Sequence, residues 1–383
     1  MAYLFETEEH EAVRDSARRF ATTHIAPRGA AWEEAEEFPA ALYATAAAAG
    51  VSGIGFPEAV GGQGGDLGHI LAAGEELLLA GRSVGTLVGL GSHNIALPPI
   101  VRFGTDEQKA RFVRPVLAGG QIAALAITEP SGGSDVAALT TKAVKDGDHY
   151  VVTGAKTFIT SGSRADIVTT AVRTGGPGHG GISLLVIERG TPCFSVGKRL
   201  RKMGWWASDT AELHFDACRV PAKNLIGAEN AAFPMIMVNF AAERLMLAGQ
   251  CVAIAELAYR ESIAYVRERQ AFGKPLSGFQ VTRHKLADMA SRLAAARALV
   301  GECVTRVLMP GGEMKAAGLA AMAKNTATDA CSFICDAAVQ LHGGYGYMRD
   351  TLVERLYRDA RLYPIGGGTR EIMNELIAKT EGY

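Results

Sequence analysis

The hydrophobic pattern of this chain changes its period twice, and this change limits the possible folds more than any single motif does. Apolar residues first recur at helical spacing, until Gly119-Gly120 ends that part. Short runs rich in Val, Ile and Thr then alternate with Gly, Asp and Ser turns, which predicts the strands of an antiparallel sheet or barrel. The last part is helical again, in long segments with short links that are typical of a bundle. The predicted helices lie at 6–24, 39–49, 66–80, 83–103, 105–117, 231–267, 279–307, 314–340, 351–362 and 369–379, and the predicted strands at 150–153, 157–160, 167–172, 182–187 and 211–215.

This order predicts an α+β fold, which differs from the alternating strands and helices of a Rossmann domain. We expect an N-terminal helical domain at 1–120, a middle antiparallel β-barrel or sheet domain at 121–228, and a C-terminal four-helix-bundle domain at 229–383. Asp66 is a candidate N-cap of the helix that follows it. Asp146-Gly147 is a turn pair of the kind that closes hairpins.

Charge and composition exclude several classes of protein. The formal net charge is -1, so no overall positive field attracts nucleic acid. No apolar run is long enough to span a membrane, and the segment that begins Met1-Ala2 lacks the basic and apolar regions of a signal peptide. Six scattered cysteines suit reduced thiols, so we expect a cytoplasmic protein. Cys331 and Cys335 share a helix face, but a metal site needs further ligands at suitable spacing, so buried thiols and no metal are expected.

Three glycine-rich segments raise the question of a nucleotide loop. Residues 61–65 lack the G-x-G-x-x-G spacing and follow no clear strand, so by themselves they are a surface loop. Gly343-Gly344 follows a helix and by itself marks the end of that helix. Residues 366–369 open a helix with Thr369 as candidate N-cap, where free N–H groups and the helix dipole favour pyrophosphate or a polarised carbonyl. A plain turn is the alternative for this last segment.

Four segments occur together in the order and spacing of one known family. They are residues 126–135 (AITEPSGGSD), 158–162 (FITSG), 268–276 (ERQAFGKPL) with Phe279-Gln280 after it, and 340–371, which begins QLHGG and ends TRE. Through these segments the chain resembles the acyl-CoA dehydrogenase family over roughly residues 5–380. The resemblance implies the fold of that family, FAD as cofactor and a homo-oligomer, which in most members is a tetramer.

The resemblance also implies two groups of cofactor contacts. Contacts around the isoalloxazine ring would come from Ile127, Thr128, Ser134, Phe158 and Thr160, with Thr160 beside flavin N5. Thr369 and Glu371 would hold the adenine end of FAD within the subunit. The FAD of a neighbouring subunit would contact Arg269, Phe272, Gln280, Gln340, Gly343 and Gly344, so the protein would be at least a dimer.

The catalytic base is the point at which this chain departs from most of the family. Most members carry a Glu at the position of Gly367, and glycine has no proton acceptor. In the branches that resemble isovaleryl-CoA and long-chain acyl-CoA dehydrogenases, the base precedes an arginine on the first long bundle helix. Glu243-Arg244-Leu245 matches that placement, so the resemblance implies that Glu243 is the base. An interhelical salt bridge is the alternative role for Glu243, and Glu371 and Glu375 are rival bases.

The remaining substrate contacts follow from the same resemblance. The N–H of Gly367 would donate to the thioester oxygen, and Ser134, Arg244 and Gly368 would contact the acyl-CoA. Trp205-Trp206 has two open interpretations, because these rings can line and shorten a pocket or pack in the core.

The function implied is FAD-dependent α,β-dehydrogenation of an acyl-CoA, with electrons passed to electron-transfer flavoprotein. Three alternatives share the scaffold. They are a flavin oxidase or monooxygenase, an acyl-CoA-binding flavoprotein that lacks a base, and an enzyme acting on a substrate bound to acyl carrier protein. The sequence does not indicate the length or branching of the acyl chain.

Overall fold

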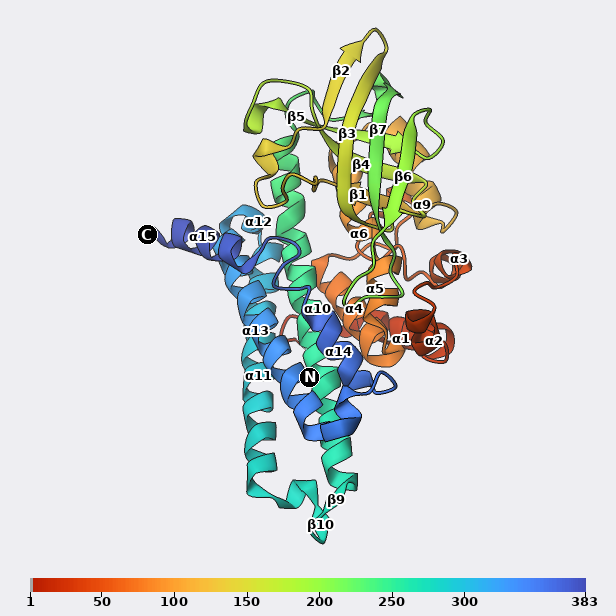
Figure 1. The fold of residues 1–383 in the computed structure, drawn as a ribbon. Helices are drawn as coiled ribbons and strands as arrows, with labels where there is room; N and C mark the ends of the chain where they lie inside the picture. Colours follow the sequence, from red (N-terminus) through yellow and green to blue (C-terminus); the bar gives the residue numbers. More distant parts are fainter. Residues whose placement is uncertain (1–2) are drawn as a thin grey trace.

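The structure, a computed structural model, describes residues 3–383 apart from the side chains of residues 313 and 314. Met1 and Ala2, with which the signal-peptide argument began, lie outside the described residues. Figure 1 shows a sheet at one end of an elongated molecule, a helical bundle extending to the other end, and N-terminal helices packed beside both.

The N-terminal part is helical, as predicted. Its α-helices are α1 (Glu8–Phe20), α2 (Gly29–Glu34), α3 (Ala41–Ala48), α4 (Leu67–Gly81), α5 (Val84–Leu90), α6 (His93–Ala96), α7 (Pro98–Phe103), α8 (Asp106–Gln108) and α9 (Arg114–Leu117). Asp66 caps α4, because its carboxylate accepts the backbone N–H groups of Gly68 and His69. The single helix predicted at 83–103 was wrong in detail, since it breaks at Gly91-Ser92 and again before Pro98-Pro99.

The middle part is a sheet with strand order β6-β7-β3-β2-β4-β5-β8, and β1 pairs with β4. Its strands are β1 (Ala123–Ala126), β2 (Lys142–Asp146), β3 (His149–Thr160), β4 (Ile167–Arg173), β5 (Ile182–Glu188), β6 (Phe194–Arg199), β7 (Thr210–Pro221) and β8 (Leu225–Ile226). The β2–β3 hairpin turns at Gly147, which has a φ of +60°. Most pairs are antiparallel as predicted, but β1–β4 and β2–β4 are parallel. Parallel pairing is possible there because long connections separate these strands in the chain.

The C-terminal part is a helical bundle, as predicted. Its elements are α10 (Ala232–Glu268), the hairpin strands β9 (Gln270–Ala271) and β10 (Lys274–Pro275), and the helices α11 (Gln280–Leu308), α12 (Gly312–Lys315), α13 (Ala317–His342), α14 (Leu352–Ala360) and α15 (Arg370–Glu381). Helix α10 runs along the bundle from the sheet towards the β9–β10 hairpin (Figure 1). Thr369 caps α15, because its hydroxyl accepts the N–H of Ile372.

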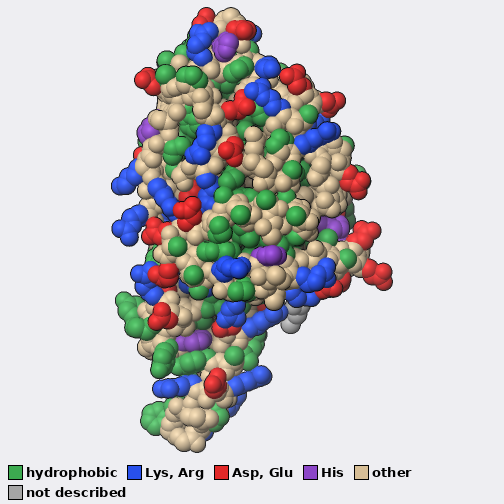
Figure 2. Space-filling model, turned by 90° about the vertical axis from the view of Figure 1, so that its right-hand side faces the viewer, with side chains coloured by type: hydrophobic (Ala, Val, Ile, Leu, Met, Phe, Trp, Pro, Cys, Tyr) green, Lys and Arg blue, Asp and Glu red, His purple; other side chains and the backbone are tan. Residues whose placement is uncertain are grey.

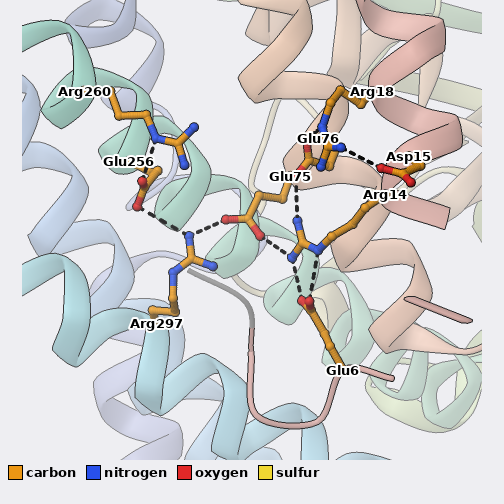
Figure 3. Close-up of polar contacts among 9 residues, drawn as sticks. All are labelled: Glu6, Arg14, Asp15, Arg18, Glu75, Glu76, Glu256, Arg260 and Arg297. Carbon is orange, nitrogen blue, oxygen red and sulfur yellow. Dashed lines mark hydrogen bonds and ion pairs between the residues drawn. The ribbon is translucent and has the colours of Figure 1, made fainter. Parts of the chain in front are cut away.

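A network of buried ion pairs joins the N-terminal helices to the bundle (Figure 3). The guanidinium of Arg14 on α1 lies 2.5 Å from Glu6, 2.6 Å from Glu75 and 3.1 Å from Glu76. On the other side of Glu75, Arg297 of α11 completes the network. Because these groups are largely excluded from water, each ion in the network depends on its partners.

The hydrophobic core also joins the parts. One cluster combines α1, α4 and α5 with the bundle helices, and a second combines α6 and α7 with β1, β4 and β5. In residues 3–383 no single helix is both long enough and apolar enough to cross a membrane. The pair Val84–Leu90 and His93–Phe103, bent by 42°, meets these two criteria only when its members are taken together.

Candidate active site

A cavity of about 1070 Å³ lies where the three parts of the chain meet. Its walls come from α4, α5 and α10, from the end of β3, and from the loops at 127–137, 200–205 and 361–369. Figure 2 shows hydrophobic side chains gathered near the middle of one face of the molecule. Phe158 and Met203, both exposed, line the cavity. Mainly apolar walls with a few convergent polar groups are typical of ligand sites.

Helix α10 presents Glu243 to this cavity. The side chain is partly exposed, and its Oε1 lies 3.6 Å from the position that a Cβ on Gly367 would occupy. Among residues 3–383, no hydrogen bond or ion pair with a protein group engages this carboxylate, so the salt bridge considered as an alternative is not formed. Burial raises the pKa of Glu243 to about 7, against the opposing charges of Arg244 and Lys324. A carboxylate with this pKa and no protein partner is suited to accept a proton near neutral pH.

Arg244 lies next to Glu243 and also lines the cavity. Its buried Nε has no hydrogen-bond partner within the described chain, and it lies 3.9 Å from where a Cβ on Gly368 would stand. Burial lowers the pKa of Arg244, and the charge of Glu243 opposes that shift. A buried guanidinium Nε–H without a protein acceptor, beside a cavity, is a suitable donor for an acceptor-rich ligand.

The glycine turn before α15 forms the part of the cavity wall beside Glu243. Gly367 has a φ of +64° and Gly368 a φ of +95°, which only glycine adopts without strain. Within the described chain, the backbone N–H groups of Gly367, Gly368 and Thr369 donate to no protein acceptor. Consecutive free N–H groups at a helix N-terminus bind anions and polarised oxygens.

Phe158 reaches the cavity because the sheet is irregular at that point. The register of β3 against β7 shifts between Lys156 and Ile159, and Phe158 has a φ of +59°. Such a bulge turns a side chain out of the strand pattern, at a cost in backbone strain. The ring is 68% exposed and offers an aromatic face to a ligand.

The loop that carries Thr128 is fixed by a buried ion pair. Lys156 on β3 lies 2.9 Å from Glu129 and also donates to the carbonyl of Ile127. Although burial opposes it, the charge of Lys156 and the hydrogen bonds from Thr140 and Thr141 lower the pKa of Glu129 to about 2. Glu129 therefore stays ionised, and it holds the preceding residues against β3.

The structure divides the residues implicated by the sequence into two groups. Ten of them line the cavity: Ile127, Thr128, Ser134, Phe158, Thr160, Glu243, Arg244, Gly367, Gly368 and Thr369. The other seven, Arg269, Phe272, Gln280, Gln340, Gly343, Gly344 and Glu371, do not line it and are exposed. Glu375, named as a rival base, is not among the lining residues either.

Most of the second group lies at the far end of the bundle, around the β9–β10 hairpin (Figure 1). From Glu243 to Arg269, α10 extends by about 39 Å at 1.5 Å per residue. Within one chain, Arg269 and Phe272 are therefore too distant to share a small ligand with Glu243. Phe272 is 96% exposed in the hairpin, which is unusual for a phenylalanine.

The sequence left the role of Trp205 open, between lining a pocket and packing in the core, and it gave no reason to single out Gln250, Tyr363 or Lys324. Trp205, which both lines the cavity and packs in the core, has a ring centroid 5.2 Å from that of Tyr363. The Tyr363 hydroxyl donates to Gln250 of α10 at 3.0 Å. Lys324 of α13 donates a hydrogen bond to the carbonyl of Gly366 in the glycine turn. Its only signal in the sequence is a lysine within a run of small apolar residues.

Trp206, unlike Trp205, does not line the cavity. Its ring packs against the guanidinium groups of Arg349 and Arg358.

One group in the described chain has potential metal ligands within 4.8 Å of one another, namely His10, Asp66 and His69. The two imidazole rings stack with centroids 3.9 Å apart and planes 23° apart. Nearly parallel rings direct their lone pairs side by side rather than towards one point. Each Nδ1 also lies within hydrogen-bonding distance of the backbone N–H at its helix cap, so helix capping accounts for this cluster.

Comparisons with known proteins identify the family of this chain. The chain matches the family models described as acyl-CoA dehydrogenase N-terminal domain over residues 7–120, middle domain over 124–218 and C-terminal domain over 231–381. It is 39% identical to an acyl-CoA dehydrogenase of Bacillus subtilis, covering 97% of this chain and 98% of that protein. It is also 39% identical to the long-chain specific acyl-CoA dehydrogenase of Sus scrofa, covering 97% of this chain and 86% of that one.

A solved structure shows the same similarity in three dimensions. A crystal structure described as a probable acyl CoA dehydrogenase from Mycobacterium abscessus superimposes with a TM-score of 0.96 at 52% identity, covering 98% of this chain and 99% of that one. Sequence and fold thus agree. The chain belongs to the acyl-CoA dehydrogenase family of flavin-dependent oxidoreductases.

Proposed function

We propose that this protein binds FAD and removes the α- and β-hydrogens of an acyl-CoA thioester, with Glu243 as the base. The observation that carries the proposal is the position of the Glu243 carboxylate. It faces the cavity, has no hydrogen-bond or ion-pair partner among the described residues, and lies 3.6 Å from where a side chain on Gly367 would begin. A base on α10 therefore reaches the region that a base on the glycine turn would occupy.

The residues around the cavity fit FAD. Phe158 offers an aromatic face for a flat ring, and the hydroxyls of Thr128 and Thr160 line the same cavity. The free N–H groups before α15 suit an anionic or carbonyl oxygen. FAD, when bound, supplies the acceptor for the hydride that leaves the β-carbon.

The chain itself has two tasks in this reaction. Glu243 accepts the proton as the α-carbon–hydrogen bond breaks, and the electron pair of that bond becomes the new double bond between the α- and β-carbons. The N–H of Gly367 donates to the thioester oxygen, which gains negative charge as the proton leaves. Because burial raises the pKa of Glu243 to about 7, this carboxylate is a stronger base than an exposed glutamate.

The lining of the cavity also supports a proposal about the acyl chain. Ile70, Ala73, Gly74 and Leu77 lie on one face of α4 and line it, opposite Leu247 and Gln250 of α10. From Glu243 to Gln250, α10 advances by about 10 Å. A Cβ on Gly74 would meet no atom within 4 Å, so this helix leaves open space over the glycine. We propose that the acyl chain runs along this space away from Glu243.

Electron transfer and assembly are part of the same proposal. Phe158 and Met203 are exposed and line the cavity, so a redox partner can approach the flavin edge there, and we propose electron-transfer flavoprotein for that role. Phe272, Tyr345 and Tyr347 are 96%, 62% and 79% exposed at the far end of the bundle. We propose that a second copy of this chain covers them, in a homotetramer that brings Arg269 and Gln280 to the cofactor of a neighbour.

Anaerobic titration of the holoprotein with a panel of acyl-CoA thioesters tests the function. The expected result is loss of the oxidised-flavin absorbance with stoichiometric formation of the 2-enoyl-CoA. Binding of thioester without bleaching would instead identify a flavoprotein without dehydrogenase activity. Reoxidation that is faster with oxygen than with electron-transfer flavoprotein would identify an oxidase.

A further inference from the structure

Lys324 is a buried cation without a carboxylate partner. The residue lies on α13 with 1% exposure, and no ion pair within the described chain includes it. Lys156, which is also fully buried, pairs with Glu129 at 2.9 Å. A buried ammonium without an anion is costly and calls for a specific explanation.

The Lys324 ammonium donates its hydrogen bonds to carbonyl groups of the glycine turn. Its Nζ donates to the carbonyl of Gly366 at 2.7 Å and to the carbonyl of Gly368 at 2.5 Å. Both carbonyls belong to the loop that precedes α15, and Gly367 lies between them. One side chain of α13 therefore holds two alternate peptide groups of this loop.

The orientation of these peptides follows from their geometry. No cis peptide bond occurs in the described chain. In a trans peptide the C=O and the following N–H point in opposite directions. When the carbonyls of Gly366 and Gly368 point to Lys324, the N–H groups of Gly367 and Thr369 point away from it. Among the residues that the structure describes, neither N–H group has a protein acceptor, and both residues line the cavity.

This contact adds to the backbone bonds that hold the two ends of the loop, which run from Gly366 to Leu362 and from Arg370 to Pro364. Three consecutive glycines have wide conformational freedom, and nothing in their own chemistry selects one orientation of the turn. Without a fixed orientation, a hydrogen-bond donor contributes less to catalysis, since reorganisation must accompany the reaction. Two bonds from a single buried ammonium supply that constraint.

We propose that Lys324 is a positioning residue, whose ammonium orients the Gly366–Thr369 turn so that the N–H of Gly367 faces the thioester oxygen. The inference rests on the proposed dehydrogenase function. It assigns to Lys324 no contact with substrate: the two peptide groups transmit its orienting effect, which is separate from the direct effect of its charge on Glu243.

The test uses the FAD-loaded Lys324→Met variant, which keeps side-chain volume but removes the charge and the donors. The first measurement is the apparent pKa at which bound acetoacetyl-CoA forms its enolate, because this ionisation depends on donors to the thioester oxygen and involves no electron transfer. We expect this pKa to rise by about one unit or more. We expect kcat with a substrate acyl-CoA to fall by about tenfold or more, with little change in KM.

Asn325→Leu is the matched control. Asn325 is the next residue on α13 and joins that helix to α15 through Asn374, at 2.9 Å, without touching the turn carbonyls. If Lys324 merely helped α15 to dock, both variants would shift enolate ionisation equally. That result would overturn the proposal, as would a Lys324→Met variant whose bound ligand ionises like that of the wild type.

A second variant covers the case in which Lys324→Met does not accumulate as holoprotein. Lys324→Gln is shorter by one bond and cannot reach both carbonyls, so a raised ligand pKa is expected for it also, and an unchanged value contradicts the inference. Failure of the underlying function has a different signature, because the wild-type holoprotein would then bleach with no acyl-CoA.

Discussion

The Oε1 atom of Glu243 lies 3.6 Å from the point at which a Cβ on Gly367 would stand. A side chain from α10 and a side chain from the distant glycine turn would therefore reach the same small region of the cavity. The methyl Cδ1 of Leu247 occupies that region more fully, since it would lie only 2.4 Å from such a Cβ. The packing around Glu243 thus favours a carboxylate that comes from α10.

Glu243→Gln should reduce the rate of flavin reduction by acyl-CoA by about a hundredfold or more, because a positioned base contributes ~10²–10⁴. The amide retains the shape of the carboxylate, so FAD content and thioester binding should stay unchanged. Stopped-flow bleaching under anaerobic conditions measures the effect. Turnover close to that of the wild type in this variant would falsify the assignment of Glu243 as the base.

The activity should rise with pH through about 7. Burial raises the pKa of Glu243 to about 7, and the charges of Arg244 and Lys324 oppose this shift. The base must be ionised to accept a proton, so kcat/KM should increase roughly tenfold per pH unit below that value and level off above it. A steady-state pH series with one thioester checks this, and a flat profile between about pH 5.5 and 8 is incompatible with it.

Gly367→Glu combined with Glu243→Gln should not restore activity. A side chain at 367 would collide with Leu247, and a φ of +64° is unfavourable for any residue other than glycine, at a cost of about 1–2 kcal/mol. Adding Leu247→Ala opens the space and should recover part of the turnover. Leu247→Ala alone is the control for its own effect on substrate binding. Full activity of the double variant with Leu247 intact would show that the packing argument is wrong.

Gly74→Leu should select against extended acyl chains. The leucine fills the open space along α4, so kcat/KM for a long-chain thioester should fall by about tenfold or more, as pocket changes of a few methylene groups do. Butyryl-CoA, which does not reach that region, should react as in the wild type. Gly74→Ala is the control, because it strengthens the helix by about 1 kcal/mol and fills little space. Equal losses on short and long substrates would contradict the proposed path of the acyl chain.

Arg14→Met should destabilise the fold by about 3–5 kcal/mol, because it leaves buried carboxylates without their cation. Glu6 and Glu75, whose side chains are each 3% exposed, lose their bonds to Arg14 (Figure 3). Arg18→Met is the matched control on the same helix. Its side chain is 47% exposed, so a change within about 1 kcal/mol is expected. Denaturant unfolding of both variants makes the comparison, and similar midpoints would show that the network contributes little.

Local features of the sequence were sufficient for most elements of the fold. Asp66 and Thr369 cap α4 and α15 as predicted, because a cap depends only on its own side chain and the next three backbone N–H groups. The long bundle helices follow from periodicity over many turns. The runs predicted at 150–153 and 157–160 form one strand, β3, because pairing with β7 continues across the irregularity between them.

The sequence by itself determined the helical, β and helical order, the caps, and the residue types from which a cavity wall can be built. The tertiary structure alone decided the rest. It turned Phe158 outward at a bulge, placed the Lys324 ammonium against the carbonyls of the glycine turn, and brought Glu243 within 3.6 Å of where a Cβ on Gly367 would stand. The physical reason is the sequence separation of the interacting residues. Caps and periodicity depend on residues that are neighbours in the chain. The position of a catalytic group instead depends on packing between segments that lie far apart in the sequence.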